Sequence, residues 1–164
     1  MNAIMMNTRQ LLTLNSVREA RERSARARVL QCRTILERYQ QQRDDQQNEL
    51  SAFHAWLPGR EAELFGALSA QPVSRGALED FQATLRLLNK HGADLALQIE
   101  DVSARINAAQ AQLEQAQSAL QVAHRAKEKL SELTMQHHQV QRDAVAKQEE
   151  LVFEEAINCR SRDS

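Results

Sequence analysis

The chain has 164 residues, of which 42 % are hydrophobic but only 4 % aromatic, and 24 are alanine. Alanine buries little area, so this composition argues against a globule with a thick core; with 19 glutamines and 26 % charged residues it is typical of long helices or coiled coils. A net charge of −1 argues against a general nucleic-acid binder, which usually carries a clear basic excess.

The sequence contains no candidate membrane segment. Its longest apolar runs are a few residues, far short of the roughly 20 needed to cross a bilayer. The opening MNAIMMNTRQ also lacks an apolar core of signal-peptide length. We therefore expect a cytoplasmic protein that does not insert into membranes.

The first predicted element is a helix over about residues 3–69. The first 57 residues contain no glycine or proline, which are unfavourable inside helices. Pro58–Gly59 predicts a kink in this helix, although a separate short helix over 60–70 is an alternative. Residues 4–18 carry a looser pattern of apolar residues. Beyond residue 18, positions three and four residues apart form a heptad seam in which two members are polar. The seam comprises Ala25, Val29, Cys32, Leu36, Tyr39, Arg43, Gln46, Leu50, Phe53 and Leu57.

The segment SAQPVS, residues 69–74, is the best candidate for a turn. Pro72 disfavours a helical residue before it, and Ser74 can cap the helix that follows. All six glycines and prolines of the chain lie between positions 58 and 92, around this segment. The turn is therefore predicted near 70–74.

The second predicted element is a helix over about 75–157, followed by a flexible tail over 158–164. Gly92 is tolerated within it. After Ala123 the seam takes an extra three-residue step to Ala126, which predicts a stammer, a local overwinding of the supercoil. The seam then continues at Leu130, Leu133, Val140 and Ala144. The seam before it comprises Leu95, Ile99, Val102, Ile106, Ala109, Leu113, Ala116, Leu120 and Ala123.

Neither helix can bury its apolar stripe alone, so each must bury the other's. The predicted fold is all-α: a long antiparallel two-helix coiled-coil hairpin, forming a single domain over residues 1–164, monomeric when isolated. With the turn near 72, residues beyond about 141 overhang the start of the first helix. This pairing places Cys32 far from Cys159, so both should remain reduced thiols.

Nothing in the sequence predicts catalysis, a cofactor or a metal site. Four scattered glycines make neither a phosphate-binding loop nor a dinucleotide fingerprint. A two-helix hairpin also offers no enclosed pocket for a substrate. His137 and His138 are adjacent and point to different helix faces, whereas zinc ligands on one helix need a spacing of three or four. We expect a non-enzymatic protein.

Two charged segments stand out. Residues 1–43 hold nine arginines and three glutamates, a charge of +6. Residues 143–155 hold five acids and one lysine, a charge of −4. In an antiparallel hairpin these segments are expected to become neighbours. Either their charges form ion pairs with one another, or they form a charged base and an acidic overhang that dock into a partner protein. Few aromatics accompany the arginines, so nucleic acid is not the expected partner.

Aromatic residues gather on the first helix. Phe53 lies on the seam, where core packing is expected, and Trp56 is one residue off it. Tyr39 and Trp56 suit the core and a partner contact equally, because such side chains serve as interface anchors. The candidates for a contact with a partner protein are Tyr39, Phe53, Trp56 and Phe65.

Several segments in order resemble the YscO/FliJ family of type III secretion systems, and its non-flagellar YscO (SctO) branch most. They are LLTLNSVREAR near the start, HAWLPGREAELFGALSAQPVSRGALEDFQATLRLL in the middle, a Gln/Ala-rich return helix, and a closing EELVFEEAI. Asn15 stands where an arginine is common in the opening motif.

The resemblance implies a cytoplasmic stalk of the secretion apparatus. In this family the paired ends of the hairpin enter the pore of the hexameric export ATPase, the other end approaches the export gate, and some members bind secretion chaperones. The implied ATPase contacts are Arg18, Glu19, Glu149, Glu150, Glu154 and Glu155, to which the charge pattern adds Arg21 and Arg26. The four aromatic candidates named above are then expected to contact the export gate or a chaperone. The alternative functions are a chaperone escort and a generic coiled-coil scaffold.

Overall fold

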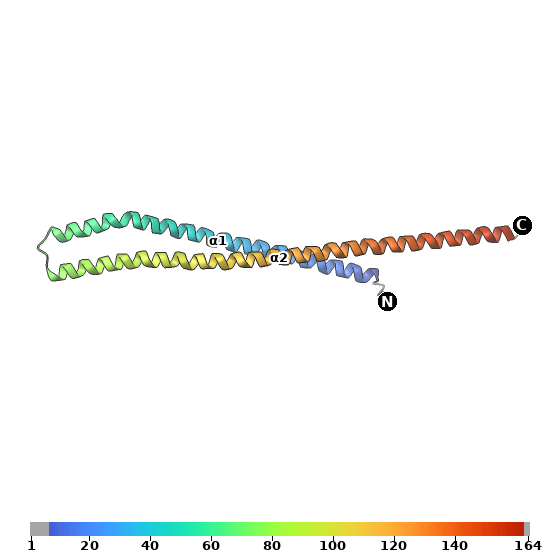
Figure 1. Cartoon of the computed structure of the whole chain (residues 1–164), viewed down its shortest axis with the longest axis horizontal. Helices are drawn as coiled ribbons and strands as arrows, with labels where there is room; N and C mark the ends of the chain where they lie inside the picture. Colours follow the sequence, from blue (N-terminus) through green and yellow to red (C-terminus); the bar gives the residue numbers. More distant parts are fainter. Residues whose placement is uncertain (1–6, 163–164) are drawn as a thin grey trace. The chain divides into compact units, whose positions relative to one another are not determined.

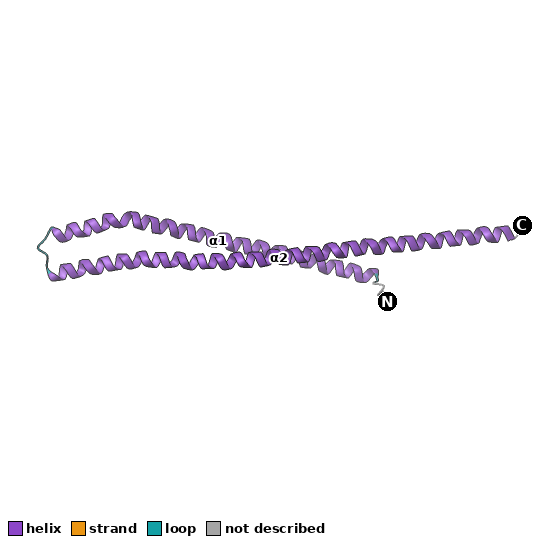
Figure 2. Cartoon of the chain, in the orientation of Figure 1, coloured by secondary structure: helices purple, strands orange, loops and turns teal. Residues whose placement is uncertain are grey.

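The computed structural model describes residues 7–162, which form two long helices and no strand. Helix α1 spans Thr8–Ser69 and helix α2 spans Arg75–Arg162. The helices pack against each other, and residues 70–74 join them as a short loop (Figures 1 and 2). The predicted antiparallel hairpin with a turn near 70–74 is confirmed.

The helix ends follow from local hydrogen bonds. Asn7 caps α1. Its side-chain oxygen accepts a hydrogen bond from the Arg9 backbone amide at 3.4 Å, and its backbone amide donates one to Gln10 Oε1 at 3.1 Å. Ser74 caps α2 as predicted, because its hydroxyl accepts a hydrogen bond from the Ala77 amide at 3.1 Å. These caps therefore account for the start of α1 and the start of α2.

Three predicted boundaries differ from the structure or fall outside it. Residues 3–6, predicted to begin the first helix, lie outside the described residues. The predicted flexible tail is wrong for residues 158–162, which continue α2. Arg160 and Arg162 lie in that last turn, where positive charge suits the negative end of the helix dipole. Helix α1 runs without a break through Pro58, so there is no separate helix over 60–70; the kink at Pro58 stays a prediction.

Two compact units divide the chain, and each helix contributes a segment to both. The tip unit is Val29–Ala116. The base unit is Met1–Arg28 with Gln117–Ser164, of which residues 7–28 and 117–162 are described.

The tip unit is held by the predicted seam. Its buried side chains are Val29 and Cys32 from α1 and Leu95, Val102, Ile106, Ala109 and Ala116 from α2. Arg43 and Gln46, the two polar members, are half-buried among the apolar ones. Near the turn the Phe53 ring meets the His91 ring edge-on, with centroids 5.0 Å apart. A Cβ at Gly92 would lie 3.0 Å from Phe53 Cε1, so the glycine makes room for this ring.

The base unit departs from the prediction. No stammer occurs after Ala123: Leu133 is 56 % exposed and Val140 65 % exposed. The residues facing α1 instead keep the regular steps of four and three, and most of them are polar. They are Lys127, Leu130, Thr134, His137 and Gln141.

Polar contacts join α1 and α2 along this part of the seam. Thr8 contacts Gln141 at 3.5 Å and Asn15 contacts Thr134 at 3.4 Å. Glu22 contacts Lys127 at 3.1 Å. These pairs recur every seven residues along each helix, in opposite directions, and so fix the register of the base unit. The end of the pairing at Gln141 agrees with the overhang expected beyond about residue 141.

Candidate partner-binding surfaces

A cluster of charged side chains surrounds Glu22 in the base unit, and we call it the node. The side chain of Glu22 is only 3 % exposed, although glutamate is rarely buried without partners. Its carboxylate contacts Arg26 of the same helix, and Lys127 and His124 across the interface at 3.1 and 3.6 Å. His124 also reaches Glu128 at 3.1 Å. The node thus ties the arginine-rich part of α1 to α2.

The neighbouring cations set the acidity of Glu22. The contact with the Lys127 ammonium lowers the pKa of Glu22 below its ordinary value of 4.5, and the charges of Arg26, Lys127 and His124 act in the same direction. Burial opposes them by raising the pKa, but it is outweighed. The carboxylate is therefore ionised throughout the neutral range.

Glu22 should make the base unit sensitive to acid. Because its pKa is lower in the folded chain, its stabilising effect is fully present above about pH 4.5 and is lost as pH falls through the folded pKa. We expect Glu22→Gln to be less stable than the parent at pH 7 and to lose less stability between pH 5 and pH 3. Urea unfolding followed by circular dichroism at each pH measures this difference. Glu19→Gln, at an exposed position of the same helix turn, should retain the parent's pH dependence.

The arginine-rich segment presents most of its predicted contact residues to solvent. Glu19 and Arg21 are exposed and Arg18 is half-buried. The Arg26 side chain is 63 % exposed, but it is bound to Glu22. The predicted contact residues on this side therefore divide into surface groups and one member of the buried node.

The acidic segment forms the far part of α2. We call residues 142–162 the overhang, because α2 continues there beyond its contact with Thr8, and every residue of the overhang is exposed. It carries the predicted contact residues Glu149, Glu150, Glu154 and Glu155. The expectation that these acids neutralise the arginines is wrong: within residues 7–162, no ion pair joins Arg18–Arg28 to the acids of 143–155. The arginines lie along the paired part of α2, and the acids lie beyond it.

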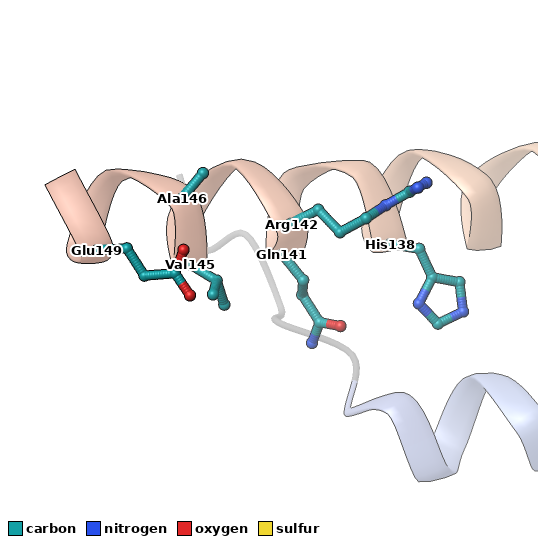
Figure 3. Close-up of a pocket in the computed structure, with 6 residues that line it drawn as sticks. All are labelled: His138, Gln141, Arg142, Val145, Ala146 and Glu149. Carbon is teal, nitrogen blue, oxygen red and sulfur yellow. The ribbon is translucent and has the colours of Figure 1, made fainter.

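Two adjoining grooves run along the overhang, and the sequence analysis did not identify them. The first is lined by His138, Gln141, Arg142, Val145, Ala146 and Glu149 (Figure 3). The second is lined by Val145, Gln148, Glu149, Val152, Phe153 and Ala156. Figure 3 shows Gln141 and Val145 pointing to the side of α2 on which α1 begins. The signal that could have revealed the grooves is the apolar spacing of Val145 and Val152.

The four aromatic candidates divide into two kinds. Tyr39 and Phe53 are half-buried on the seam. Trp56 and Phe65 are 51 % and 63 % exposed. The Trp56 ring lies against Phe53, with centroids 5.9 Å apart, so the seam partly orients it. Only Trp56 and Phe65 present large apolar surfaces that a partner could reach.

The structure provides little for other kinds of chemistry. Cys32 is buried and Cys159 is exposed, and both are free thiols, as expected. Within residues 7–162 no group of three or more His, Cys, Asp or Glu side chains could hold a metal ion. No helix in this part of the chain is long and apolar enough to cross a membrane.

Comparison with known proteins identifies the family. A family model described as "Type III secretion protein YscO" matches residues 11–159, nearly the whole chain. No curated protein and no solved structure matches. The match covers the arginine-rich segment, the turn, the aromatic residues and most of the overhang. The chain belongs to the YscO family and is a component of a type III secretion system.

Proposed function

We propose that this protein is a non-catalytic cytoplasmic stalk that links the export ATPase hexamer to the export gate and raises ATPase turnover. The observation that supports it best is that, among the described residues of the base unit, no ion pair joins the arginine-rich segment to the acids of the overhang. Arg18, Glu19 and Arg21 lie where α1 and α2 pair, and the acids of the overhang lie beyond the pairing. A ring whose subunits differ in state can steer such an asymmetric charged surface.

The proposal assigns the two units to different partners. The base unit binds the ATPase through Arg18, Glu19, Arg21, Arg26 and the overhang acids. The tip unit binds the export gate, or a secretion chaperone, through Trp56 and Phe65, while Tyr39 and Phe53 hold the helix that carries them. Exposed aromatic side chains are the usual anchors of such contacts.

Charge reversal tests the ATPase contact. We expect Arg18→Glu/Arg21→Glu to weaken binding to the purified ATPase hexamer by at least about tenfold. The ATPase surface that binds these arginines must be acidic, and it would repel the two glutamates. ATPase stimulation should fall in parallel. The readouts are pull-down and phosphate release. Arg26 is left unchanged in this variant because it also holds Glu22.

A matched variant separates local contact from net charge. Arg33→Glu/Arg38→Glu makes the same change at two exposed positions of the tip unit and should leave ATPase binding unchanged. Equal binding by both variants would exclude the charged-base mechanism. Tight chaperone complexes without any effect on ATP hydrolysis would favour the escort alternative. A mass well above 18.6 kDa by light scattering would favour a multi-chain scaffold.

A further inference from the structure

The overhang continues the surface that α2 uses to bind α1. Gln141 is the last described residue of α2 that contacts α1, through Thr8. Val145, Gln148 and Val152 follow it at steps of four, three and four, and all three line the grooves. This is the spacing that a facing helix requires. The overhang is therefore half of a coiled coil without a described second half.

The apolar side chains of this surface are open to solvent. Val145 is 54 % exposed, Val152 66 % and Phe153 68 %. An amphipathic helix gains most of its stability by burying such a face, and a single helix of this length is marginal in water. A second helix laid in the groove would bury these residues and continue the existing interface.

The acidic middle part of the overhang, residues 143–155, limits what that helix can be. This segment carries five acids and one lysine and is flanked by Arg142, Arg160 and Arg162. Arg142 lines the first groove, and Glu149 lines both. A cationic partner relieves the repulsion among these acids. A second copy of this chain would instead place one −4 segment against another.

We infer that the overhang binds a single basic amphipathic helix of its partner, which packs apolar side chains against Val145 and Val152 and places lysine or arginine beside Glu149. The inference rests on the proposed function in that this helix is taken to belong to the export ATPase. It adds the chemistry of the partner: one helix, basic, with apolar residues at heptad spacing. The partner's helix thus packs against the part of α2 that follows Gln141.

A designed peptide tests the recognition without the ATPase. The probe is a fluorescent peptide of about three heptads with leucine at the two core positions and lysine at the flanking positions. We expect the full-length protein to bind it and Val152→Asp to bind about tenfold more weakly, because a valine that the peptide would cover is replaced by a charge. Ile157→Asp adds the same charge at an exposed residue outside both grooves and should change binding by less than about twofold.

A second peptide tests the charge preference. The same peptide with glutamate in place of lysine should bind at least about tenfold more weakly. Equal binding of the two peptides would overturn the inference, as would equal losses for Val152→Asp and Ile157→Asp. Concentration-dependent dimerisation that Val152→Asp abolishes would also overturn it, since a second copy would then be the occupant.

Photo-crosslinking from position 152 to the ATPase hexamer connects the inference to the proposed function. A crosslink to a basic amphipathic helix of the ATPase supports both, and a crosslink to an acidic or non-helical segment overturns the inference alone. Absence of any ATPase binding, with selective binding of the lysine peptide retained, would refute the proposed function and leave the overhang's preference intact.

Discussion

Reversing the charge of Glu22 is expected to separate α1 from α2 in the base unit. In Glu22→Lys the new ammonium faces Arg26, His124 and Lys127 at a position where the native side chain is 3 % exposed. Buried like charges cannot be screened by water, so the paired segments must move apart. Backbone amides over residues 9–25 and 120–141 should exchange at least about tenfold faster than in the parent. Hydrogen exchange with mass spectrometry measures this directly.

Two further variants show whether the node is responsible. Glu19→Lys changes the charge by the same amount at an exposed position of the same helix, and it should leave exchange in the base unit unchanged. The double reversal Glu22→Lys/Lys127→Glu restores an opposite pair across the interface and should recover part of the protection. Unchanged exchange in Glu22→Lys, or no recovery in the double variant, would show that the ion pairs do not hold the base unit together.

The hairpin could be predicted because its determinants are local. The glycines and prolines are confined to positions 58–92, and Ser74 lies where a cap for α2 is needed. Each of these residues affects the helix only within a few positions along the chain. The seam of the tip unit was equally predictable, because all but two of its members are apolar and they repeat every three and four residues on both helices.

The seam of the base unit could not be predicted in this way. Leu133 and Val140 are apolar, so the periodicity of the sequence predicts that they are buried, yet both are exposed. The true seam passes through Lys127 and Thr134, whose partners Glu22 and Asn15 lie more than a hundred residues earlier in the chain. Polar pairing of this kind is invisible when each helix is read alone. The mispredicted stammer therefore follows from reading apolar character as burial.

The binding surfaces were predictable in charge but not in arrangement. The arginine-rich segment and the acidic segment were both apparent from composition, and their mutual neutralisation was one of the two expectations. The structure separates them because, among residues 7–162, the last contact between the two helices joins Gln141 to Thr8, and the acids of 143–155 follow it on α2. Which acids remain unpaired depends on the register, and polar contacts between distant residues determine that register.

A pair of leucines distinguishes the observed seam from the predicted stammer. Leu130 is 5 % exposed and Leu133 is 56 % exposed, so only Leu130 contributes a buried side chain. Leu130→Ala should lower the free energy of unfolding by about 2–3 kcal/mol, because it removes apolar contacts and leaves a gap between the helices. Leu133→Ala should change it by less than about 0.5 kcal/mol, as expected for a surface substitution in a helix.

Urea unfolding followed by circular dichroism at 222 nm measures both changes, and alanine is a strong helix former at either position. The helix propensity term is therefore the same in the two variants, and the difference between them reports burial alone. If Leu133→Ala were as destabilising as Leu130→Ala, the seam would follow the apolar residues after all. Lys127 would then no longer face α1, and the ion pairs of Glu22 would have no basis.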